Sequence, residues 1–177
     1  MSVNTSNLIF DRDVITQLSQ KNAEPDWMLD FRLKALEKAS SLPLPNVEKT
    51  HIRQWNFTEF QPYTEEAVLS RFDELPETVR SFAQEEADGR NLIVQHNSTV
   101  VYTELMPDLQ RKGVIFTDLH TALREHGDLV RKVFMTDASQ ADEHKLTALH
   151  AALWSGGAFL YVPKNVELDV PIQSLVW

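Results

Sequence analysis

The end of the chain shows the clearest alternation of apolar and polar positions. Leu146, Leu149 and Leu153 are spaced i, i+3 and i+7, which predicts an amphipathic helix. Glycine at 156–157 follows at once, and glycine is the residue that most often ends a helix. Residues 158–162 are apolar at both odd and even positions, so we expect a strand that is covered on both faces.

A turn and a second strand are predicted after that strand. Residues 162–165, Val-Pro-Lys-Asn, favour a tight turn because Pro fixes φ and Asn tolerates a positive φ. Val166, Leu168 and Val170 alternate with acidic residues, which predicts a half-exposed strand. A third apolar run reaches Trp177 without a turn or polar tail. We therefore expect a β-rich body to begin here, and the chain to be the amino-terminal piece of a longer protein.

The start of the chain has helical periodicity. A short helix can begin at Asp11 or at Asp13, and a second begins at Pro25 and runs to about residue 40. In the second helix Trp27, Phe31 and Ala35 recur at i, i+4 and i+8, on one face. This spacing predicts that Trp27 is an anchor of the hydrophobic core.

The middle of the chain predicts a small sheet among short helices. Residues 91–95 and 99–103 are rich in β-formers and are separated by a turn sequence, which predicts a hairpin, and 113–116 can add a third strand. Short helices are expected after Thr64, Pro76, either Thr117 or Asp118, and Asp128, with Phe82 and Val133 among their buried residues. The predicted fold class is therefore α+β, with the helices and the small sheet preceding the strands that follow residues 156–157.

Two stretches resemble the SufB/SufD family, the scaffold subunits of bacterial iron–sulfur cluster assembly. The first is LHAALWSGGAF at 149–159, with Tyr-Val-Pro at 161–163 and Val-Pro-Ile at 170–172. The second is Glu-Pro-Asp-Trp at 24–27, with Leu-Pro-Leu-Pro at 42–45. The resemblance thus reaches both ends of the chain.

A third region and two departures complete the comparison with the family pattern. Glu48, Arg53 and Trp55 match an acidic–basic–Trp cluster, although a structural role, with Trp55 packed onto the preceding helix, is the favoured interpretation. The family usually has Gly where Asn165 stands and often Asn where His150 stands. Both departures are mild, since Asn also reaches positive φ.

The resemblance implies an α+β amino-terminal domain over 1–155 and the first strands of a β-helix core over 156–177. It further implies a SufD-like, non-catalytic scaffold that pairs with a SufB-type subunit and binds a SufC-type ATPase. The family's residues for iron or cluster handling would lie beyond Trp177, so none is assigned to this chain. Two alternatives stay open: the start of a β-helix carbohydrate-cleaving enzyme, and an interaction module with no cluster role.

Composition narrows the classes of partner. The net charge is −9 and basic residues are scattered, which argues against nucleic acid and against an anionic membrane surface. No apolar run approaches the ~20 residues of a membrane span, and the first residues lack a signal-peptide pattern. The chain has no cysteine, which excludes disulfides and thiolate metal sites within it and fits a cytoplasmic protein.

A search for catalytic chemistry gives no candidate residue for catalysis, cofactor binding or metal ligation. His120 and His126, like His144 and His150, are six residues apart, whereas zinc helices use i, i+3 or i, i+4. His150 lies on an apolar helix face, so a hydrogen-bonded core histidine is expected. Ser-Gly-Gly at 155–157 lacks the strand–Ser–helix order of a nucleophile elbow, and no phosphate-binding glycine loop is present.

The last strands raise one further expectation. If the next rung of a β-helix is absent, the backbone groups of residues 158–177 and the side chains of Phe159, Leu160, Leu175 and Trp177 lack partners. An unpaired apolar strand edge recruits another strand. We therefore expect the chain to associate with itself through residues 158–177.

Overall fold

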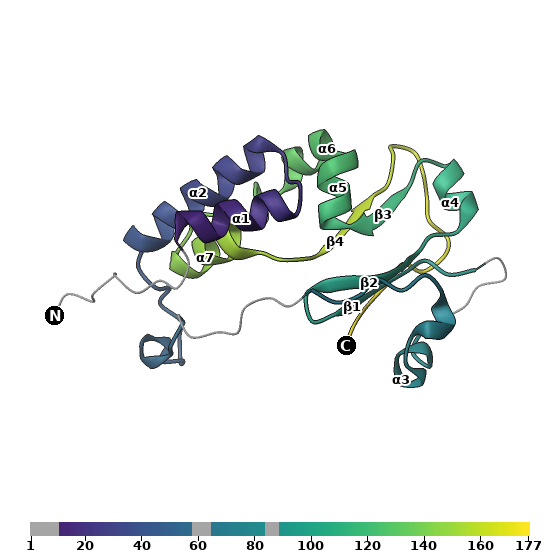
Figure 1. Ribbon diagram of the computed structural model, residues 1–177, viewed down its shortest axis with the longest axis horizontal. Coiled ribbons are helices and arrows are strands. Elements are labelled where there is room, and N and C mark those ends of the chain that lie inside the picture. The colour runs from purple at the N-terminus through teal and green to yellow at the C-terminus, as the bar shows by residue number, and fades with distance from the viewer. Residues whose placement is uncertain (1–10, 58–64, 84–88) are drawn as a thin grey trace. The chain divides into compact units, whose positions relative to one another are not determined.

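The computed structural model describes residues 11–57, 65–83 and 89–177 (Figure 1). The chain divides into two compact units, and each unit is made of two separate stretches of sequence. Unit 1 combines Met1–Pro62 with His126–Trp154, and unit 2 combines Tyr63–Glu125 with Ser155–Trp177. The chain last passes from unit 1 to unit 2 between Trp154 and Ser155. The division into domains at 155/156 stays a prediction.

Unit 1 is helical. Its described helices are α1 (Arg12–Lys21), α2 (Asp26–Ser41), the 3₁₀ turn η1 (Ile52–Gln54), α6 (Gly127–Val133) and α7 (Lys145–Leu153). The predicted start of the first helix is confirmed, because the Asp11 side chain accepts a hydrogen bond from the Val14 N–H at 3.0 Å. Pro25 occupies the N-cap of α2, as its fixed φ favours.

The core of unit 1 lies between α2 and α7, whose sequences are about a hundred residues apart. The residues buried at this contact are mostly alanine, which lets two helix backbones approach closely: Ala35, Ala39, Ala148, Ala151 and Ala152. Ile15 of α1 packs in the same buried cluster as Ala35 and Ala151. Ala35 thus faces inward as predicted.

The prediction that Trp27 anchors the core is wrong. Met28, the next residue, is fully buried, while Trp27 is only half-buried and belongs to no cluster of buried residues. The Arg131 guanidinium lies 5.6 Å from the centroid of the Trp27 ring. The inward face of α2 therefore passes through Met28, Arg32 and Leu36, each one residue after a member of the predicted face, and Ala35 is the one member of that predicted face that is buried.

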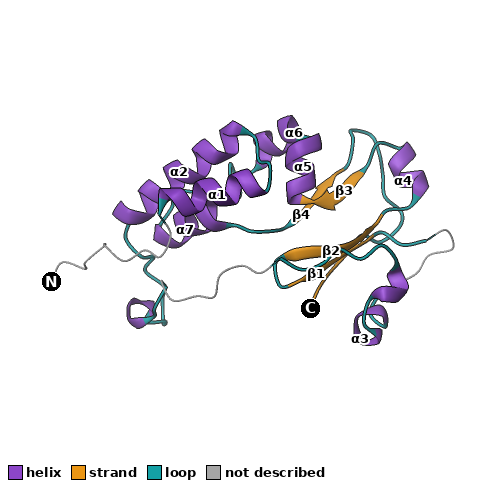
Figure 2. Ribbon diagram, viewed as in Figure 1, coloured by secondary structure: helices purple, strands orange, loops and turns teal. Residues whose placement is uncertain are grey.

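Unit 2 contains two small sheets with short helices (Figure 2). The three-stranded sheet has the order β2-β1-β5, and the two-stranded sheet pairs β3 with β4. The strands are β1 (Leu92–His96), β2 (Thr99–Glu104), β3 (Ile115–Asp118), β4 (Ala158–Tyr161) and β5 (Gln173–Val176). The helices are η2 (Phe72–Glu74), α3 (Glu77–Arg80), α4 (Pro107–Arg111) and α5 (Leu119–Glu125).

The predicted hairpin is confirmed. β1 and β2 pair antiparallel with His96 opposite Thr99, and Asn97 in the turn has φ 54°. The third strand, β3, is also present, but it pairs with β4 instead of extending the hairpin. Asp118 ends β3 and caps α5, accepting a hydrogen bond from the Thr121 N–H at 2.9 Å.

The last stretch of the chain is better paired than we expected. β4 pairs antiparallel with β3, and β5 pairs in parallel with β1, at the centre of the sheet. Phe159 is buried, and Leu175 packs against the core that the hairpin forms with Leu75 and Val79. The premise that these side chains lack partners is therefore wrong for Phe159 and Leu175, and it is also wrong for Trp177, whose ring stacks on His96.

The strand predicted around Val166, Leu168 and Val170 does not form. The tight turn precedes it as expected, with Asn165 at φ 65°, although the closing hydrogen bond runs from the Val166 N–H to the Pro163 carbonyl. The alternation still determines burial, because the three apolar side chains pack against the cluster of Met106, Leu109 and Val114. This stretch is therefore held in place by side-chain packing and not by a ladder of backbone hydrogen bonds.

Three further predictions for the middle of the chain need correction. No helix covers residues 65–69, where the Leu69 N–H instead donates to the Val101 carbonyl beside β2; Thr64 itself lies outside the described residues. The helix after Pro76 spans only Glu77–Arg80, and the Phe82 side chain is 74% exposed. Val133 is likewise exposed at the end of α6.

Helices and small sheets together confirm the α+β class, while the β-helix stays a prediction. Within the described residues, no helix is both long enough and apolar enough to cross a membrane.

Candidate functional site

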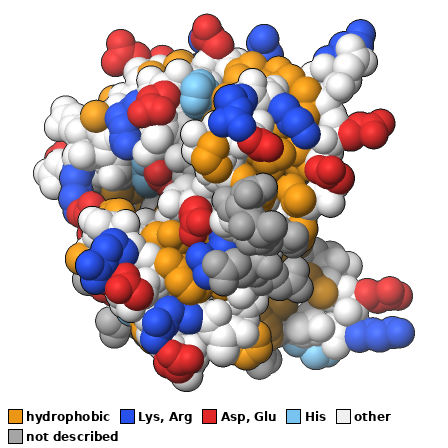
Figure 3. Space-filling view, turned by 90° about the vertical axis from the view of Figure 1, so that its right-hand side faces the viewer, with side chains coloured by type: hydrophobic (Ala, Val, Ile, Leu, Met, Phe, Trp, Pro, Cys, Tyr) orange, Lys and Arg blue, Asp and Glu red, His pale blue; other side chains and the backbone are white. Residues whose placement is uncertain are grey.

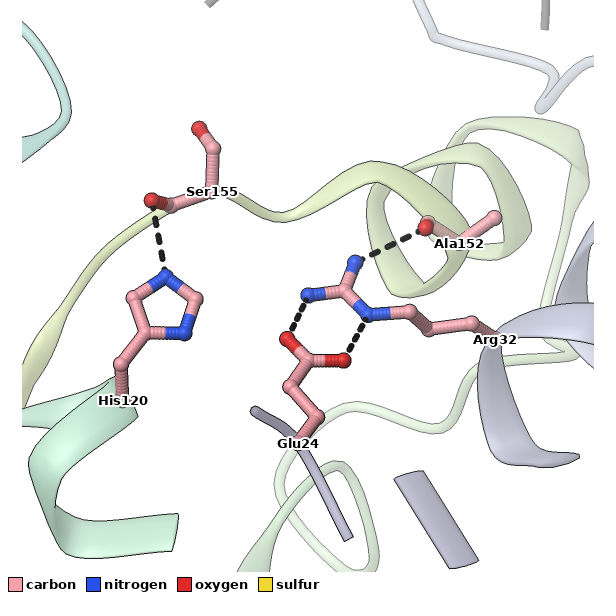
Figure 4. Close-up of polar contacts among 5 residues, drawn as sticks. All are labelled: Glu24, Arg32, His120, Ala152 and Ser155. Atoms are coloured by element: carbon pink, nitrogen blue, oxygen red, sulfur yellow. Dashed lines mark hydrogen bonds and ion pairs between the residues drawn. The ribbon is translucent and has the colours of Figure 1, made fainter. Parts of the chain in front are cut away.

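A buried arginine is the centre of the polar contacts in unit 1. The Arg32 guanidinium forms two parallel hydrogen bonds with the Glu24 carboxylate, at 2.8 Å from Nε and 2.6 Å from Nη2 (Figure 4). Its Nη1 donates to the Ala152 carbonyl at 2.9 Å, near the end of α7. Both charged side chains are fully buried. A charge in this environment needs such pairing, since an isolated buried ion is very costly.

A row of contacting aromatic rings begins at the same arginine. The guanidinium carbon of Arg32 lies 4.2 Å from the Trp154 ring centroid, a cation–π contact. Trp154 lies 5.5 Å from Phe134, which in turn makes an edge contact with Phe31 at 5.5 Å. The two sequence regions that carried the family resemblance, around Glu24 and around Trp154, are therefore joined through one side chain.

This network stabilises the fold of unit 1 and exposes no reactive group to solvent. The Arg32 and Glu24 charges neutralise each other, and their donors and acceptors are engaged with protein atoms. The sequence analysis did not identify Arg32. A signal existed, because a charged residue four positions after Met28 falls on the inward face of an amphipathic helix and implies a buried partner.

In unit 2, the Ser-Gly-Gly stretch at 155–157 contacts the start of α5 and the turn of the β1–β2 hairpin. The Ser155 carbonyl lies 3.2 Å from Nε2 of His120, and the Gly157 carbonyl accepts a hydrogen bond from the Leu119 N–H at 2.9 Å. Gly156 lies directly against the backbone of Ser98 in the hairpin turn. The glycines therefore serve a close backbone approach, which agrees with the prediction that this stretch is no nucleophile elbow.

The histidines are separate in structure and serve different roles. His144 caps α7, and its Nδ1 accepts a hydrogen bond from the Thr147 N–H at 3.1 Å. His96 stacks on Trp177 with ring centroids 4.1 Å apart. The prediction of a core histidine at His150 is wrong, because this residue is exposed. Among the described residues, no group of three His, Asp or Glu side chains could hold a metal ion.

A second polar cluster is found on the hairpin of unit 2. The Tyr102 hydroxyl donates to Glu104 at 2.7 Å, and the Arg90 guanidinium lies 3.8 Å from the Phe72 ring centroid. Burial, and then the hydrogen bond to Glu104 and its negative charge, raise the pKa of Tyr102 well above its usual range. The phenol therefore stays neutral and acts as a hydrogen-bond donor, with no role as a base.

The region around Trp55 differs from the expectation. Trp55 is 59% exposed and contacts Phe57, with ring centroids 6.1 Å apart, so it does not pack onto α2 as a cap. The preceding loop, residues 45–54, lines a hollow open to solvent and is anchored by buried Ile52. Of the residues that the structure describes, only this loop lines the hollow, so no polar groups from separate segments converge there as they do in a ligand site.

On the face of the molecule in Figure 3, the described basic side chains form no patch of their own. Lys and Arg side chains are interspersed with Asp and Glu side chains on the face in Figure 3. Several basic groups are paired with neighbouring carboxylates, as Arg71 is with Asp73 at 3.0 Å. A nucleic-acid surface instead gathers basic side chains in one patch.

The comparisons with known proteins give the family. The model of the SufBD protein N-terminal region matches residues 17–174, nearly the whole chain. The chain belongs to the SufBD family. The match to the SufBD model includes both motif regions that Arg32 joins.

Relatives within the SufBD family share much of this sequence. The chain is 47% identical over 171 residues to the iron-sulfur cluster assembly protein SufD of Bacillus subtilis. The aligned region covers 96% of the chain and 39% of that protein. It is 39% identical to a SufBD family protein of Staphylococcus epidermidis and 37% identical to one of Staphylococcus aureus, each over 92% of the chain and 36% of the relative. The chain thus spans less than two-fifths of the length of these relatives.

Proposed function

We propose that this SufBD chain is the amino-terminal part of a non-catalytic, SufD-like scaffold subunit of iron–sulfur cluster assembly, and that it works in the cytoplasm. The observation that carries the proposal is the 47% identity to a SufD protein over 96% of the chain. The relatives' names all refer to iron–sulfur cluster assembly, so neither the carbohydrate-cleaving enzyme nor the unrelated interaction module is favoured.

The architecture supports a structural role for this part of the protein. Its most elaborate polar network, around Arg32, is fully buried and faces no solvent. Among the described residues, no three His, Asp or Glu side chains form a group that could hold a metal ion. We propose that the cluster chemistry depends on residues of the intact protein beyond Trp177.

We further propose that the intact protein continues into a β-helix core and pairs there with a SufB-type subunit, while a SufC-type ATPase binds it as a third component. The parallel pairing of β5 with β1 supports the first step, because parallel pairing is also the pairing of a β-helix. The helical unit 1 would then lie outside the core.

Co-purification tests this proposal. The intact protein, carrying an affinity tag, is expressed with the SufB-type and SufC-type proteins of the same organism, and the eluate is analysed by mass spectrometry and native mass measurement. We expect a stable assembly that contains all three proteins and that accepts an iron–sulfur cluster. A tagged, folded protein that retains neither subunit would overturn the proposal. A carbohydrate-cleaving activity in the same preparation would replace it.

A further inference from the structure

The residue that precedes α7 is a histidine, and its ring caps the helix. Nδ1 of His144 accepts a hydrogen bond from the Thr147 N–H at 3.1 Å. In return, the Thr147 hydroxyl accepts from the His144 N–H at 3.0 Å and donates to the His144 carbonyl at 2.8 Å. Nδ1 thus takes the place of the side-chain oxygen of Ser, Thr, Asp or Asn, the usual caps. The acceptor of this cap is therefore an atom that can take up a proton near neutral pH.

Only a neutral ring with its hydrogen on Nε2 can make this bond. An imidazolium carries a hydrogen on both nitrogens, so Nδ1 of His144 changes from acceptor to donor when the ring is protonated. Two N–H groups, one from the ring and one from Thr147, would then face each other. The positive charge would also lie at the N-terminal end of α7, where the helix dipole disfavours a cation.

The acidic residues beside the cap do not replace the lost bond. Asp142 and Glu143 directly precede His144, and both are exposed. The Glu143 carboxylate is engaged locally, since it accepts a hydrogen bond from the Gln140 N–H at 2.9 Å. In the described stretches of the chain, no carboxylate forms an ion pair with His144. Exposed charges in water attract one another only weakly, so these two carboxylates compensate little for a protonated ring.

The other charges near the start of α7 also leave the ring without an ionic partner. Lys145, the next residue, has the same sign as an imidazolium, and its backbone N–H donates to the Pro43 carbonyl at 2.9 Å. The end of α2 packs against the start of α7 through Ala39 and Ala148. The charged residues of α2 nearest to this end, Glu37 and Lys38, are exposed and of opposite sign.

We propose that His144 is a pH-sensitive cap, and that protonation of its ring loosens the first turn of α7 from α2. The cap is formed at a pH above the range in which histidine titrates and is lost as the pH falls through that range, from about 8 to about 5. Leu146 and Ala148 follow the cap and pack in the cluster that contains Ala39, so the loosening reaches the contact between the two helices. This inference is independent of the proposed scaffold function.

Hydrogen exchange at the Thr147 and Ala148 amides tests the cap, in this chain or in the intact protein. The wild type is compared with His144→Asn, which keeps a cap at every pH, and with His144→Ala, which has no cap at any pH. We expect the wild type to exchange like the Asn variant at about pH 7.5 and like the Ala variant at about pH 5.5. The two variants should differ by on the order of fivefold in rate. Comparison at equal pH removes the intrinsic pH dependence of exchange.

His150→Asn is the matched control, because His150 is an exposed histidine of the same helix. This variant should keep the full pH response of the wild type. A wild type that exchanges like the Asn variant at both pH values, or like the Ala variant at both, would overturn the proposal. So would a pH response that disappears in His150→Asn and persists in His144→Asn.

Discussion

Gly156 lies against the backbone of Ser98, a residue more than fifty positions earlier in the hairpin turn. A Cβ atom at Gly156 would come closer than 3.0 Å to both the carbonyl oxygen and the carbonyl carbon of Ser98, a separation that real Cβ atoms essentially never show. The atoms that block it belong to the backbone, so no side-chain rotation can make room. Gly156 is therefore required by packing between two segments of unit 2.

Gly156→Ala should destabilise the protein by about 2 kcal/mol or more, because the added methyl group must displace the hairpin turn. Gly127→Ala is the matched control, since a Cβ there meets nothing within 4 Å and the residue begins a helix. We expect this control to leave the stability unchanged or to raise it by up to about 1 kcal/mol. Urea unfolding of both variants measures the difference; equal stabilities would refute the account of Gly156.

Arg32→Met should cost about 3–5 kcal/mol, because it leaves the Glu24 carboxylate buried and unpaired. Adding Glu24→Gln to that variant should recover part of the loss, since the remaining uncompensated charge is removed. Arg71→Ala serves as the control, because the Arg71–Asp73 pair is exposed and should contribute at most about 1 kcal/mol. Chemical denaturation of the single and double variants tests the coupling; additive effects would argue against it.

Trp154→Ala should cost about 3–5 kcal/mol, as removal of a buried aromatic side chain does. Trp27→Ala should cost clearly less, because Trp27 is half-buried and its neighbour Met28 fills the core. Thermal melts of the two variants, compared under the same conditions, decide the order. A larger loss for Trp27→Ala would restore Trp27 as the anchor of α2.

Tyr102 should make the protein sensitive to alkaline pH. Its raised pKa means that the folded state favours the neutral phenol, so this contribution is complete below the ordinary tyrosine pKa of about 10 and is lost as the pH rises above it. Tyr102→Phe should therefore lose less stability between about pH 9 and about pH 11 than the wild type. Urea midpoints across this range measure the effect, with Tyr161→Phe as the control. Parallel curves for Tyr102→Phe and the wild type would contradict it.

The isolated chain should bind no stoichiometric iron, zinc or iron–sulfur cluster. It has no cysteine, and its described His, Asp and Glu side chains form no group of ligands. Elemental analysis after anaerobic loading with iron and sulfide, followed by desalting, is the measurement. Metal that remains bound in a fixed ratio would show that this part of the protein handles cargo directly.

Local patterns in the sequence were sufficient to predict several helix starts and the hairpin turn, and to identify the family. Asp11 and Asp118 are helix caps where their side chains predicted helix starts, and Asn97 supplies the positive φ of the hairpin turn. These features depend on residues within a few positions of one another, so the sequence displays both partners together. The motif at 149–159 likewise identified the SufBD family from adjacent residues.

The tertiary structure decided which face of each element is buried. Trp27 and Met28 are neighbours on α2, and only the tertiary packing of unit 1 decides that Met28 is the buried one. The docking of α7, which follows about a hundred residues later, buries Ala35 of the same helix. The same docking places Arg32 beside Ala152 and gives its charge a buried partner in Glu24. Periodicity shows that a helix has an apolar side. Which of two neighbouring residues on that side is buried is decided only by the shape of the element that packs against it.

The pairing between distant strands could not be predicted from the sequence either. Val166, Leu168 and Val170 alternate as a strand would, yet their backbone forms no ladder because their side chains pack on α4 and its flanking residues. β5, with weaker alternation, becomes a strand because β1 offers it a free edge in parallel register. Strand formation requires a backbone partner, and which edge is available is settled only once the rest of unit 2 has folded.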